Sequence, residues 1–335
     1  MERILVTGAA GFVGHAVCAQ LLRDGFTVLG LDNLTPYYDV RLKQARLQKL
    51  EDHPGFSFRH LDLADAATTR EAFGTFQPEA VVHLAAQAGV RYSLDNPAAY
   101  TSANVDGFLS VLEACRAHPV RHLVYASSSS VYGANTKVPF SEKDPVDRPV
   151  SLYAATKRAN ELMAQTYGHL FRIPASGLRF FTVYGPWGRP DMAYYKFTDA
   201  IFAGRPIDLY NHGRMARDFT YIDEVVEAIR RLTLQPPADR VAGEEPGRID
   251  PGVPHRVFNI GNHTPVELER FVDVLEAAIG RRAERRLRPM QPGDVERTYA
   301  DVEALRQAVD FAPRTSIEEG LARFVAWYRT YHQPA

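Results

Sequence analysis

The sequence predicts an α/β protein built on a doubly wound parallel sheet, with a smaller α/β domain towards its C-terminus. Short apolar segments alternate with amphipathic helical segments as far as residue 182, and this alternation is typical of parallel strands joined by helices. The first apolar segment, residues 3–6, leads into a glycine-rich turn, and the second, residues 26–31, ends at an acidic residue. The length of 335 residues suggests about two domains.

The composition is that of an ordinary globular protein. The formal net charge is −1 and no long basic run occurs, so we expect no nucleic-acid partner. No apolar run reaches about 18 residues, so we expect neither a signal peptide nor a membrane span. Cys18 and Cys115 lie in apolar helical patterns without metal-ligand spacing. They predict buried free thiols in a cytoplasmic protein that binds no metal.

The glycine-rich turn comprises Gly8, Gly11, Phe12, Val13 and Gly14, with two alanines after the first glycine. Glycines let the backbone approach a pyrophosphate, and a following helix offers unpaired N–H groups at its positive end. The same residues would also suit a tight strand–helix connection. The strand before the turn and the amphipathic helix after it favour a dinucleotide site.

Asp32 and Asn33 follow the second strand, about 20 residues beyond the glycine turn. An acid at this position is placed to bind the hydroxyls of an adenosine ribose. Because a carboxylate would repel a 2′-phosphate, Asp32 favours NAD over NADP.

The segment 40–50 predicts a helix whose basic residues form a solvated outer face. A third strand, residues 56–60, is followed by Asp62 and Leu63. Asp62 could bond an adenine amino group or cap the helix at 65–76, and the sequence leaves both readings open.

The fourth buried strand, residues 80–85, is followed by small residues at 86–91 that suit the face of a flat cofactor. His83 within the strand is expected to be a packed core histidine. A long helix is predicted from residue 97 to about 118. Asn104, polar among apolar neighbours, is expected to brace backbone at the site.

Residues 127–130 form a run of serines after the fifth strand. Such a run is often a polar loop, but at the carboxyl end of a parallel strand it points into the ligand crevice. Tyr153 and Lys157 are four residues apart and share one face of a helix that Ser151 is placed to cap. Free tyrosine titrates near about 10, so proton transfer near neutrality needs a shift of about three units, or about 4 kcal/mol. We expect the Lys157 cation to supply part of it.

The regular alternation ends after residue 182, where a turn-rich segment begins. We predict an NAD-binding domain at residues 1–182, to which segments near 211–234 and 255–262 return. Residues 183–335 would form most of a discontinuous substrate domain.

Taken together, these motifs resemble the extended short-chain dehydrogenase/reductases, whose cofactor domain is a Rossmann fold. Within that superfamily the chain resembles nucleotide-sugar epimerases, and most closely the UDP-glucuronate 4-epimerases. The motifs that carry this second resemblance are HLAAQAGVR at 83–91, SSSSVYG at 127–133, RFFTVYGPWGRPDM at 179–192 and RDFTYID at 217–223.

The resemblance implies that NAD stays bound through the cycle. Tyr153 would take the proton of the sugar 4-hydroxyl while C4 gives a hydride to the nicotinamide, and the 4-keto sugar would turn and be reduced on its other face. Ser128 would bond the 4-oxygen, and Lys157 would hold the nicotinamide ribose and lower the pKa of the phenol. Arg217 and Asp294 would face the uridine diphosphate.

The cofactor and substrate sites follow from the motifs and the resemblance together. The expected NAD contacts are Gly8, Gly11, Phe12, Val13, Gly14, Asp32, Asn33, Asp62, Leu63, Leu84, Ala85, Ala86, Gln87, Asn104, Ser127, Tyr153, Lys157, Phe180 and Val183. The expected contacts of the UDP-sugar are Arg91, Ser128, Ser129, Ser130, Thr182, Arg189, Arg217, Arg288 and Asp294.

Ser129 and Ser130 distinguish among the reactions of this superfamily. Related 4,6-dehydratases place Asp-Glu, and related decarboxylases a Glu, directly after the catalytic hydroxyl. Serine hydroxyls cannot act as a carboxylate acid or base, so elimination is not expected. With Thr182 and Arg189 they could instead hold a substrate carboxylate by charge-assisted bonds.

Some alternatives remain open. An epimerase for neutral sugars such as UDP-glucose is the second reading, because one or two contacts can switch such specificity. A non-catalytic NAD-binding regulator is a third, which the retained serine, tyrosine and lysine disfavour. Gln291 stands where many relatives carry an arginine, and Arg288 is the expected substitute. The resemblance also suggests a homodimer paired through helices 97–118 and 151–171.

Overall fold

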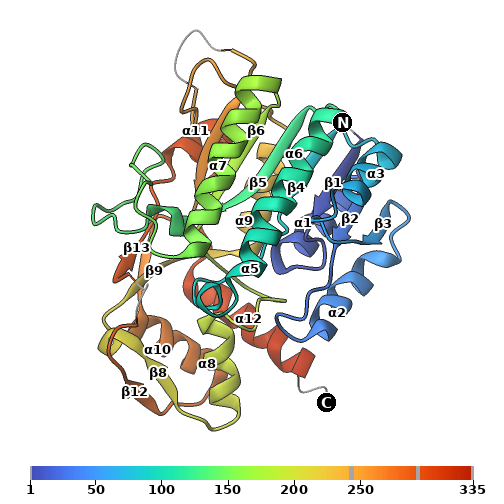
Figure 1. Cartoon of the computed structure of the whole chain (residues 1–335). Coiled ribbons are helices and arrows are strands. Elements are labelled where there is room, and N and C mark those ends of the chain that lie inside the picture. Colours follow the sequence, from blue (N-terminus) through green and yellow to red (C-terminus); the bar gives the residue numbers. More distant parts are fainter. Residues whose placement is uncertain (1, 241–244, 292–294, 333–335) are drawn as a thin grey trace.

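The computed structural model describes residues 2–240, 245–291 and 295–332, and its centre is a seven-stranded parallel sheet (Figure 1). The strand order is β10-β6-β5-β4-β1-β2-β3, and every neighbouring pair runs parallel. The strands are β1 (Arg3–Thr7), β2 (Thr27–Asp32), β3 (Phe56–His60), β4 (Ala80–His83), β5 (His122–Ser128), β6 (Ala175–Phe180) and β10 (His255–Ile260). The expected α/β fold with a doubly wound sheet is confirmed.

Helices cover both faces of the sheet. One layer contains α3 (Ala66–Phe76), α6 (Gly107–Ala117) and α7 (Leu152–Phe171) (Figure 1). The other contains α1 (Phe12–Arg23), α2 (Val40–Glu51), α9 (Ile222–Thr233) and α11 (Glu303–Val309). Side chains alternate along a strand, so Ile4 and Val6 join the core under α1 and α9, whereas Leu5 joins the core under α3 and α6.

The helix predicted at 97–118 is interrupted. It consists of α5 (Pro97–Tyr100), the π-helical turn η1 (Thr101–Asp106) and α6, and the short α4 (Tyr92–Asp95) precedes it. Asn104 lies in the π turn, where its side chain exchanges hydrogen bonds with the backbone of Gln87. Such wide turns recur at functional sites, and an unbroken α-helix was therefore the wrong expectation here.

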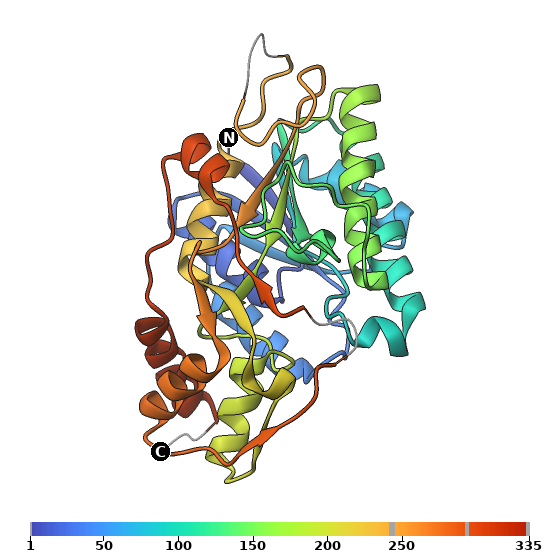
Figure 2. The same cartoon turned by 90° about the vertical axis from the view of Figure 1, so that its left-hand side faces the viewer.

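A smaller lobe sits at the carboxyl ends of the central strands (Figure 2). Its helices are α8 (Ala193–Phe202), α10 (Leu268–Ile279) and α12 (Ile317–His332). Its strands are β7 (Thr182–Tyr184), β8 (Ile207–Leu209), β9 (Ala216–Tyr221), β11 (Pro265–Glu267), β12 (Arg285–Leu287) and β13 (Arg297–Thr298). The 3₁₀ turns are η2 (Ser129–Tyr132) and η3 (Tyr210–Gly213). After β9 the chain returns to the large sheet as α9 and β10, and it then re-enters the smaller lobe at β11.

The solvated basic face predicted for helix α2 is wrong for two of its residues. Lys43 is 5% exposed and Arg46 is 0% exposed. Both lie on the helical face that carries Leu42, Leu47 and Leu50, which are also buried. Their charged groups reach oxygen partners inside the protein, which is the condition for burying a cation.

Cys18 and Cys115 are buried and unpaired, as predicted. Among the described residues, no helix is both long and apolar enough to cross a membrane. In the same part of the chain, no cluster of three acidic, histidine or cysteine side chains is arranged to hold a metal ion.

Candidate active site

A cavity of about 1040 Å³ lies between the carboxyl ends of the central strands and the smaller lobe. It opens where the strand order reverses, between β1 and β4, which is where open α/β sheets bind their ligands. The cavity is lined by most of the residues predicted for the site, namely Gly8, Gly11, Phe12, Val13, Gly14, Asp32, Asn33, Asp62, Leu63, Leu84, Ala85, Ala86, Gln87, Arg91, Ser127, Ser128, Ser129, Ser130, Tyr153, Lys157, Phe180, Thr182, Val183, Arg189 and Arg217.

The glycine turn is packed too tightly for side chains. A Cβ on Gly14 would lie 1.9 Å from the Gly8 carbonyl oxygen, and a Cβ on Gly8 would lie 2.7 Å from the Ala85 nitrogen. Helix α1 begins here without a side-chain cap and without an acid in its first turn. The residues of its first turn line the cavity, so its free N–H groups and positive end fit a pyrophosphate.

The adenosine side of the cavity centres on Asp32, at the end of β2. Its carboxylate accepts the Ala10 N–H at 3.1 Å and lies 3.8 Å from the buried Lys43 ammonium. The Asn33 amide donates to Asp62 at 2.9 Å, which places both at one edge of the cavity. Asp65, not Asp62, caps helix α3, so one of the two readings of Asp62 is removed. These residues fit the adenosine half of NAD.

The first two serines of the run make different contacts. Ser127 is 2% exposed, and its hydroxyl donates to Glu161 on α7 at 2.7 Å. Ser128 accepts the Ser130 N–H at 3.2 Å and hydrogen-bonds the phenol of Tyr153. Ser128 is therefore the hydroxyl next to the candidate base. Ser151 caps α7 by accepting the Ala154 N–H at 3.1 Å, as predicted.

The expected lowering of the Tyr153 pKa by Lys157 is not what the structure shows. Removal from bulk water raises the pKa of Tyr153, while the Ser128 hydrogen bond and the charge of Arg189 lower it. Burial lowers the pKa of Lys157 to about 7, so this amine is only partly charged near neutrality. Its Nζ donates to the Ala126 carbonyl at 2.9 Å. Burial therefore outweighs the attraction that a lysine one helical turn away suggested.

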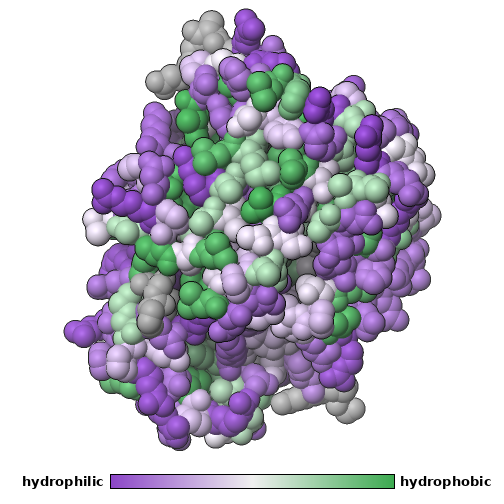
Figure 3. All heavy atoms as spheres, viewed as in Figure 1, coloured by the Kyte–Doolittle hydropathy of each residue, from purple (hydrophilic) through white to green (hydrophobic). Residues whose placement is uncertain are grey.

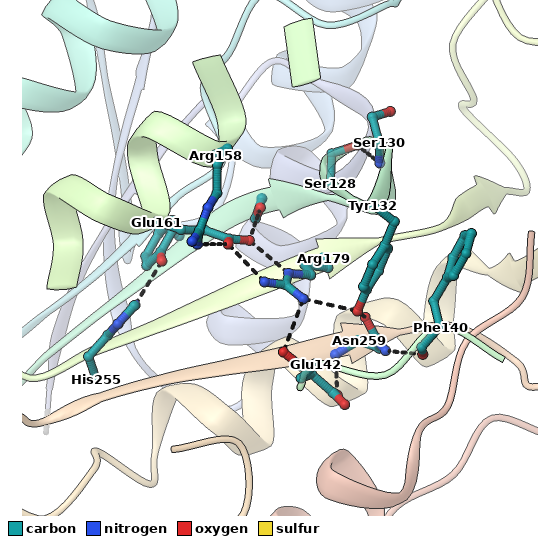
Figure 4. Close-up of polar contacts among 12 residues, drawn as sticks. Ser128, Ser130, Tyr132, Phe140, Glu142, Arg158, Glu161, Arg179, His255 and Asn259 are labelled. Atoms are coloured by element: carbon teal, nitrogen blue, oxygen red, sulfur yellow. Dashed lines mark hydrogen bonds and ion pairs between the residues drawn. The ribbon is translucent and has the colours of Figure 1, made fainter. Parts of the chain in front are cut away.

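A buried polar network supports the serine run from below (Figure 4). Glu161 and Arg179 are each 1% exposed and form two parallel hydrogen bonds at 2.8 and 2.9 Å. Arg179 also donates to the Tyr132 hydroxyl at 3.0 Å, and Tyr132 donates to Asn259 at 2.6 Å. The network thus joins β5, β6, β10 and α7 at the strand ends that face the cavity. A paired buried charge of this kind fixes geometry more than it adds stability.

The opposite wall is formed by the loop at residues 185–192, between β7 and α8, called the 185–192 loop below. Arg189 donates twice to Asp191, once at 3.0 Å, and Asp191 also accepts from Tyr37 at 3.2 Å. Burial alone would raise the pKa of Asp191, but the Arg189 charge outweighs it and lowers that pKa. Trp187 adopts a left-handed conformation with φ of 64°, which is uncommon for a bulky residue.

Three predicted contacts do not line the cavity or are not described. Asn104 is 1% exposed and braces Gln87 and Thr156 behind the wall. Arg288 pairs with Asp208 at 3.0 Å, and of the two only Asp208 lines the cavity. Asp294 falls outside the described residues.

Sequence reasoning missed Lys43, Arg46, Tyr37, Asp191 and Glu161. A spacing pattern existed for the two on α2, because Lys43 and Arg46 share the helical positions of its leucines. Glu161 also repeats the four-residue spacing of Tyr153 and Lys157 on α7. Nothing in the local sequence identifies Tyr37 and Asp191 as partners, since they are far apart in the chain.

The family profile described as NAD dependent epimerase/dehydratase matches residues 4–261, and the chain belongs to this family. The chain is 52% identical, over 97% of its length and 96% of the relative, to the probable UDP-glucuronate 4-epimerase of Rhizobium meliloti (strain 1021). It is 47% identical, over 98% of its length and 77% of the relative, to UDP-glucuronate 4-epimerase 3 of Arabidopsis thaliana.

A solved structure of a related protein has the same overall fold. UDP-glucuronic acid 4-epimerase from Bacillus cereus, in complex with UDP-glucuronic acid and NAD, superposes with a TM-score of 0.88 at 29% identity. The match covers 99% of this chain and 100% of that one. The resemblance drawn from the motifs is thereby confirmed at the level of the family and the fold.

Proposed function

We propose that this protein is a UDP-glucuronate 4-epimerase that interconverts UDP-glucuronate and UDP-galacturonate through a 4-keto intermediate. The observation that carries the proposal is one cavity that brings Tyr153, Ser128 and Lys157 between the glycine turn and the arginine of the 185–192 loop. The full-length relatives near 50% identity support the same activity.

The chain's own groups fit the proton transfers of this reaction. Bound NAD supplies a reversible hydride acceptor for C4 of the sugar. Tyr153 takes the proton of the 4-hydroxyl as the ketone forms, and it returns a proton to the same oxygen when the turned keto sugar is reduced on the other face of C4. Ser128, already bonded to the phenol, stabilises the phenolate and orients the sugar 4-oxygen. Lys157 lies one helical turn further along α7, placed to hold the nicotinamide ribose.

A carboxylate on the sugar needs a firm anchor. The 4-keto form of a uronic acid is a β-keto acid, which readily loses carbon dioxide if its carboxylate is free to turn. Arg189, Thr182, Ser129 and Ser130 all line the cavity and offer a guanidinium, three hydroxyls and no acid or base for elimination. We infer that they hold the carboxylate and so prevent decarboxylation.

A product assay on a panel of UDP-sugars tests the proposal. Purified protein should convert UDP-glucuronate to UDP-galacturonate without added NAD, and Tyr153→Phe should lower the rate by at least about 100-fold while NAD stays bound. Net reduction of added NAD, or carbon dioxide as the main product, would contradict the proposal. Activity that survives in Tyr153→Phe would contradict the assignment of the base.

A 4-epimerase for neutral UDP-sugars is the second candidate. The pairing of Arg189 with Asp191 favours it, because this wall already balances its own charge without a substrate carboxylate. A clear preference for UDP-glucose over UDP-glucuronate in the same panel would decide for this candidate.

We further propose a cytoplasmic homodimer. Each subunit would have an NAD-binding unit made of residues 1–182 and of those parts of the returning segments that join the large sheet, namely α9 and β10. Exposed Leu109 on α6 and Leu162, Leu170 and Phe171 on α7 support the dimer. Figure 3 shows hydrophobic side chains gathered over these two helices. Light scattering that gives the mass of a single chain would rule the dimer out.

A further inference from the structure

Arg46 on helix α2 is a fully buried cation that touches both halves of the site. Its Nε and Nη2 donate to the Trp187 carbonyl at 3.1 and 2.6 Å, and Nη2 also donates to the Gly188 carbonyl at 3.1 Å. Its Nη1 donates to the Ala10 carbonyl at 3.1 Å and to the Tyr38 hydroxyl at 2.7 Å. Each N–H group of the guanidinium therefore has an oxygen partner.

These partners belong to two segments that are far apart in the sequence. Ala10 lies in the glycine turn, and its own N–H is held by Asp32. Trp187 and Gly188 directly precede Arg189 in the 185–192 loop. One rigid planar group thus sets the distance between the turn that faces a pyrophosphate and the loop that presents Arg189.

While Arg46 is in place, the 185–192 loop has little freedom to adopt another conformation. Trp187 is held in a left-handed conformation, and a Cβ on Gly188 would lie 2.2 Å from the Tyr194 hydroxyl. The Arg189 N–H also donates to Tyr194 at 3.2 Å. A strained loop of this kind persists only where its surroundings fix it, and Arg46 supplies three of the bonds that do so.

The positive charge of Arg46 can also attract the anionic part of the cofactor. Its five hydrogen bonds end on four formally neutral oxygens, while nearby Asp32 pairs with Lys43. A buried cation that pairs with no acid in the described part of the chain, placed behind the glycine turn, favours an anion on the cavity side of that turn.

We propose that Arg46 is a positioning residue for both ligands, so that retention of NAD and affinity for the uronate end of the substrate depend on the same guanidinium. The part that concerns the uronate rests on the function proposed above. The part that concerns NAD rests only on membership of the family.

The test uses Arg46→Gln and Arg46→Lys in the full-length holoenzyme, with Arg41→Gln as the matched control. Arg41 lies on the same helix, but its side chain is 85% exposed and pairs with the neighbouring Asp39. NAD is quantified after gel filtration and its dissociation rate is measured. KM and kcat for UDP-glucuronate and the inhibition constant of UDP are measured with NAD in excess. UDP lacks the sugar carboxylate that Arg189 is proposed to hold, so it serves as the reference ligand.

We expect Arg46→Gln to release NAD at least about tenfold faster and to raise KM for UDP-glucuronate about tenfold even with NAD in excess. The UDP inhibition constant and kcat should change less than about threefold, since the loop is displaced but the catalytic groups are not. Arg46→Lys keeps the charge but has fewer donors, so it should restore most NAD retention and leave KM raised. Arg41→Gln should match the wild type.

A folded Arg46→Gln with wild-type NAD retention and KM would overturn the proposal. So would a parallel rise of KM and of the UDP inhibition constant with a lowered melting temperature, because that pattern indicates a purely structural role. If Arg46→Gln does not fold, Arg46→Lys decides alone, and an unchanged KM overturns the proposal. If the wild type does not act on UDP-glucuronate, the proposed function fails, while NAD dissociation still tests Arg46.

Discussion

Replacing Lys157 with methionine should stabilise the nucleotide-free protein near neutral pH while removing its activity. Burial lowers the pKa of Lys157 from 10.5 to about 7, a shift worth about 5 kcal/mol in favour of the neutral amine. Between these two pH values the unfolded chain holds a proton that the folded chain has lost, so wild-type stability rises with pH in this window. Below pH 7 Lys157 is protonated in both states, so it adds nothing to the pH dependence of the free energy of unfolding.

The size of the effect follows from the same linkage. Burial of Lys157 lowers the free energy of unfolding by about 4 kcal/mol at pH 7 and by about 2 kcal/mol at pH 9, and this loss is the burden on the folded state. Methionine removes this burden but leaves the Ala126 carbonyl without its donor, which costs about 1–3 kcal/mol. Lys157→Met should therefore be more stable than the wild type by about 2 kcal/mol at pH 7, and this advantage should disappear by about pH 9.

Urea unfolding of both proteins at pH 7, 8 and 9 measures this difference, and other titrating groups cancel in the comparison. Lys143→Met is the control, because Lys143 is exposed and its loss should leave the pH dependence of stability unchanged. A stability difference between Lys157→Met and the wild type that stays constant from pH 7 to 9 would refute the reasoning. Turnover by Lys157→Met should fall by at least about 100-fold.

Three further predictions concern the glycine turn and two buried charged groups, Arg179 and Glu142. Gly14→Ala places a Cβ 1.9 Å from a carbonyl oxygen of the glycine turn, so the purified variant should contain little NAD; a full complement of cofactor would contradict the fit of that turn. Arg179→Met leaves Glu161 buried and poorly paired and should cost about 3–5 kcal/mol, whereas Arg158→Met, which removes a partly exposed partner of the same acid, should cost less than about 1 kcal/mol; equal losses in urea unfolding would contradict the difference in burial. Burial raises the pKa of Glu142 to about 7, so the folded state holds its proton more tightly and stability falls as pH rises from about 4.5 to 7; Glu142→Gln should remove that part of the slope, and an unchanged slope would refute it.

Patterns within a few residues predicted the framework well. Alternating strands and helices, the glycine turn and the Tyr153–Lys157 spacing all describe local backbone, and the structure places them around one cavity. The burial, hydrogen bonding and local backbone conformation of the site residues were harder to predict, because they depend on residues distant in sequence. The π turn at Asn104 exists where its side chain meets Gln87, and Arg46 is buried because the 185–192 loop offers it carbonyls. Neither partner is visible from the local pattern.

The return of the chain to its own sheet has a consequence for how the molecule folds. Strand β10 completes the edge beside β6, and α9 covers α1, yet both are made after the chain has begun the smaller lobe. A chain released after residue 182 would leave an unpaired strand edge and an uncovered apolar helix face. The cofactor half therefore cannot mature ahead of the rest during synthesis, and the halves of two relatives cannot be exchanged as independent cassettes. We expect a single cooperative melting transition for the whole chain.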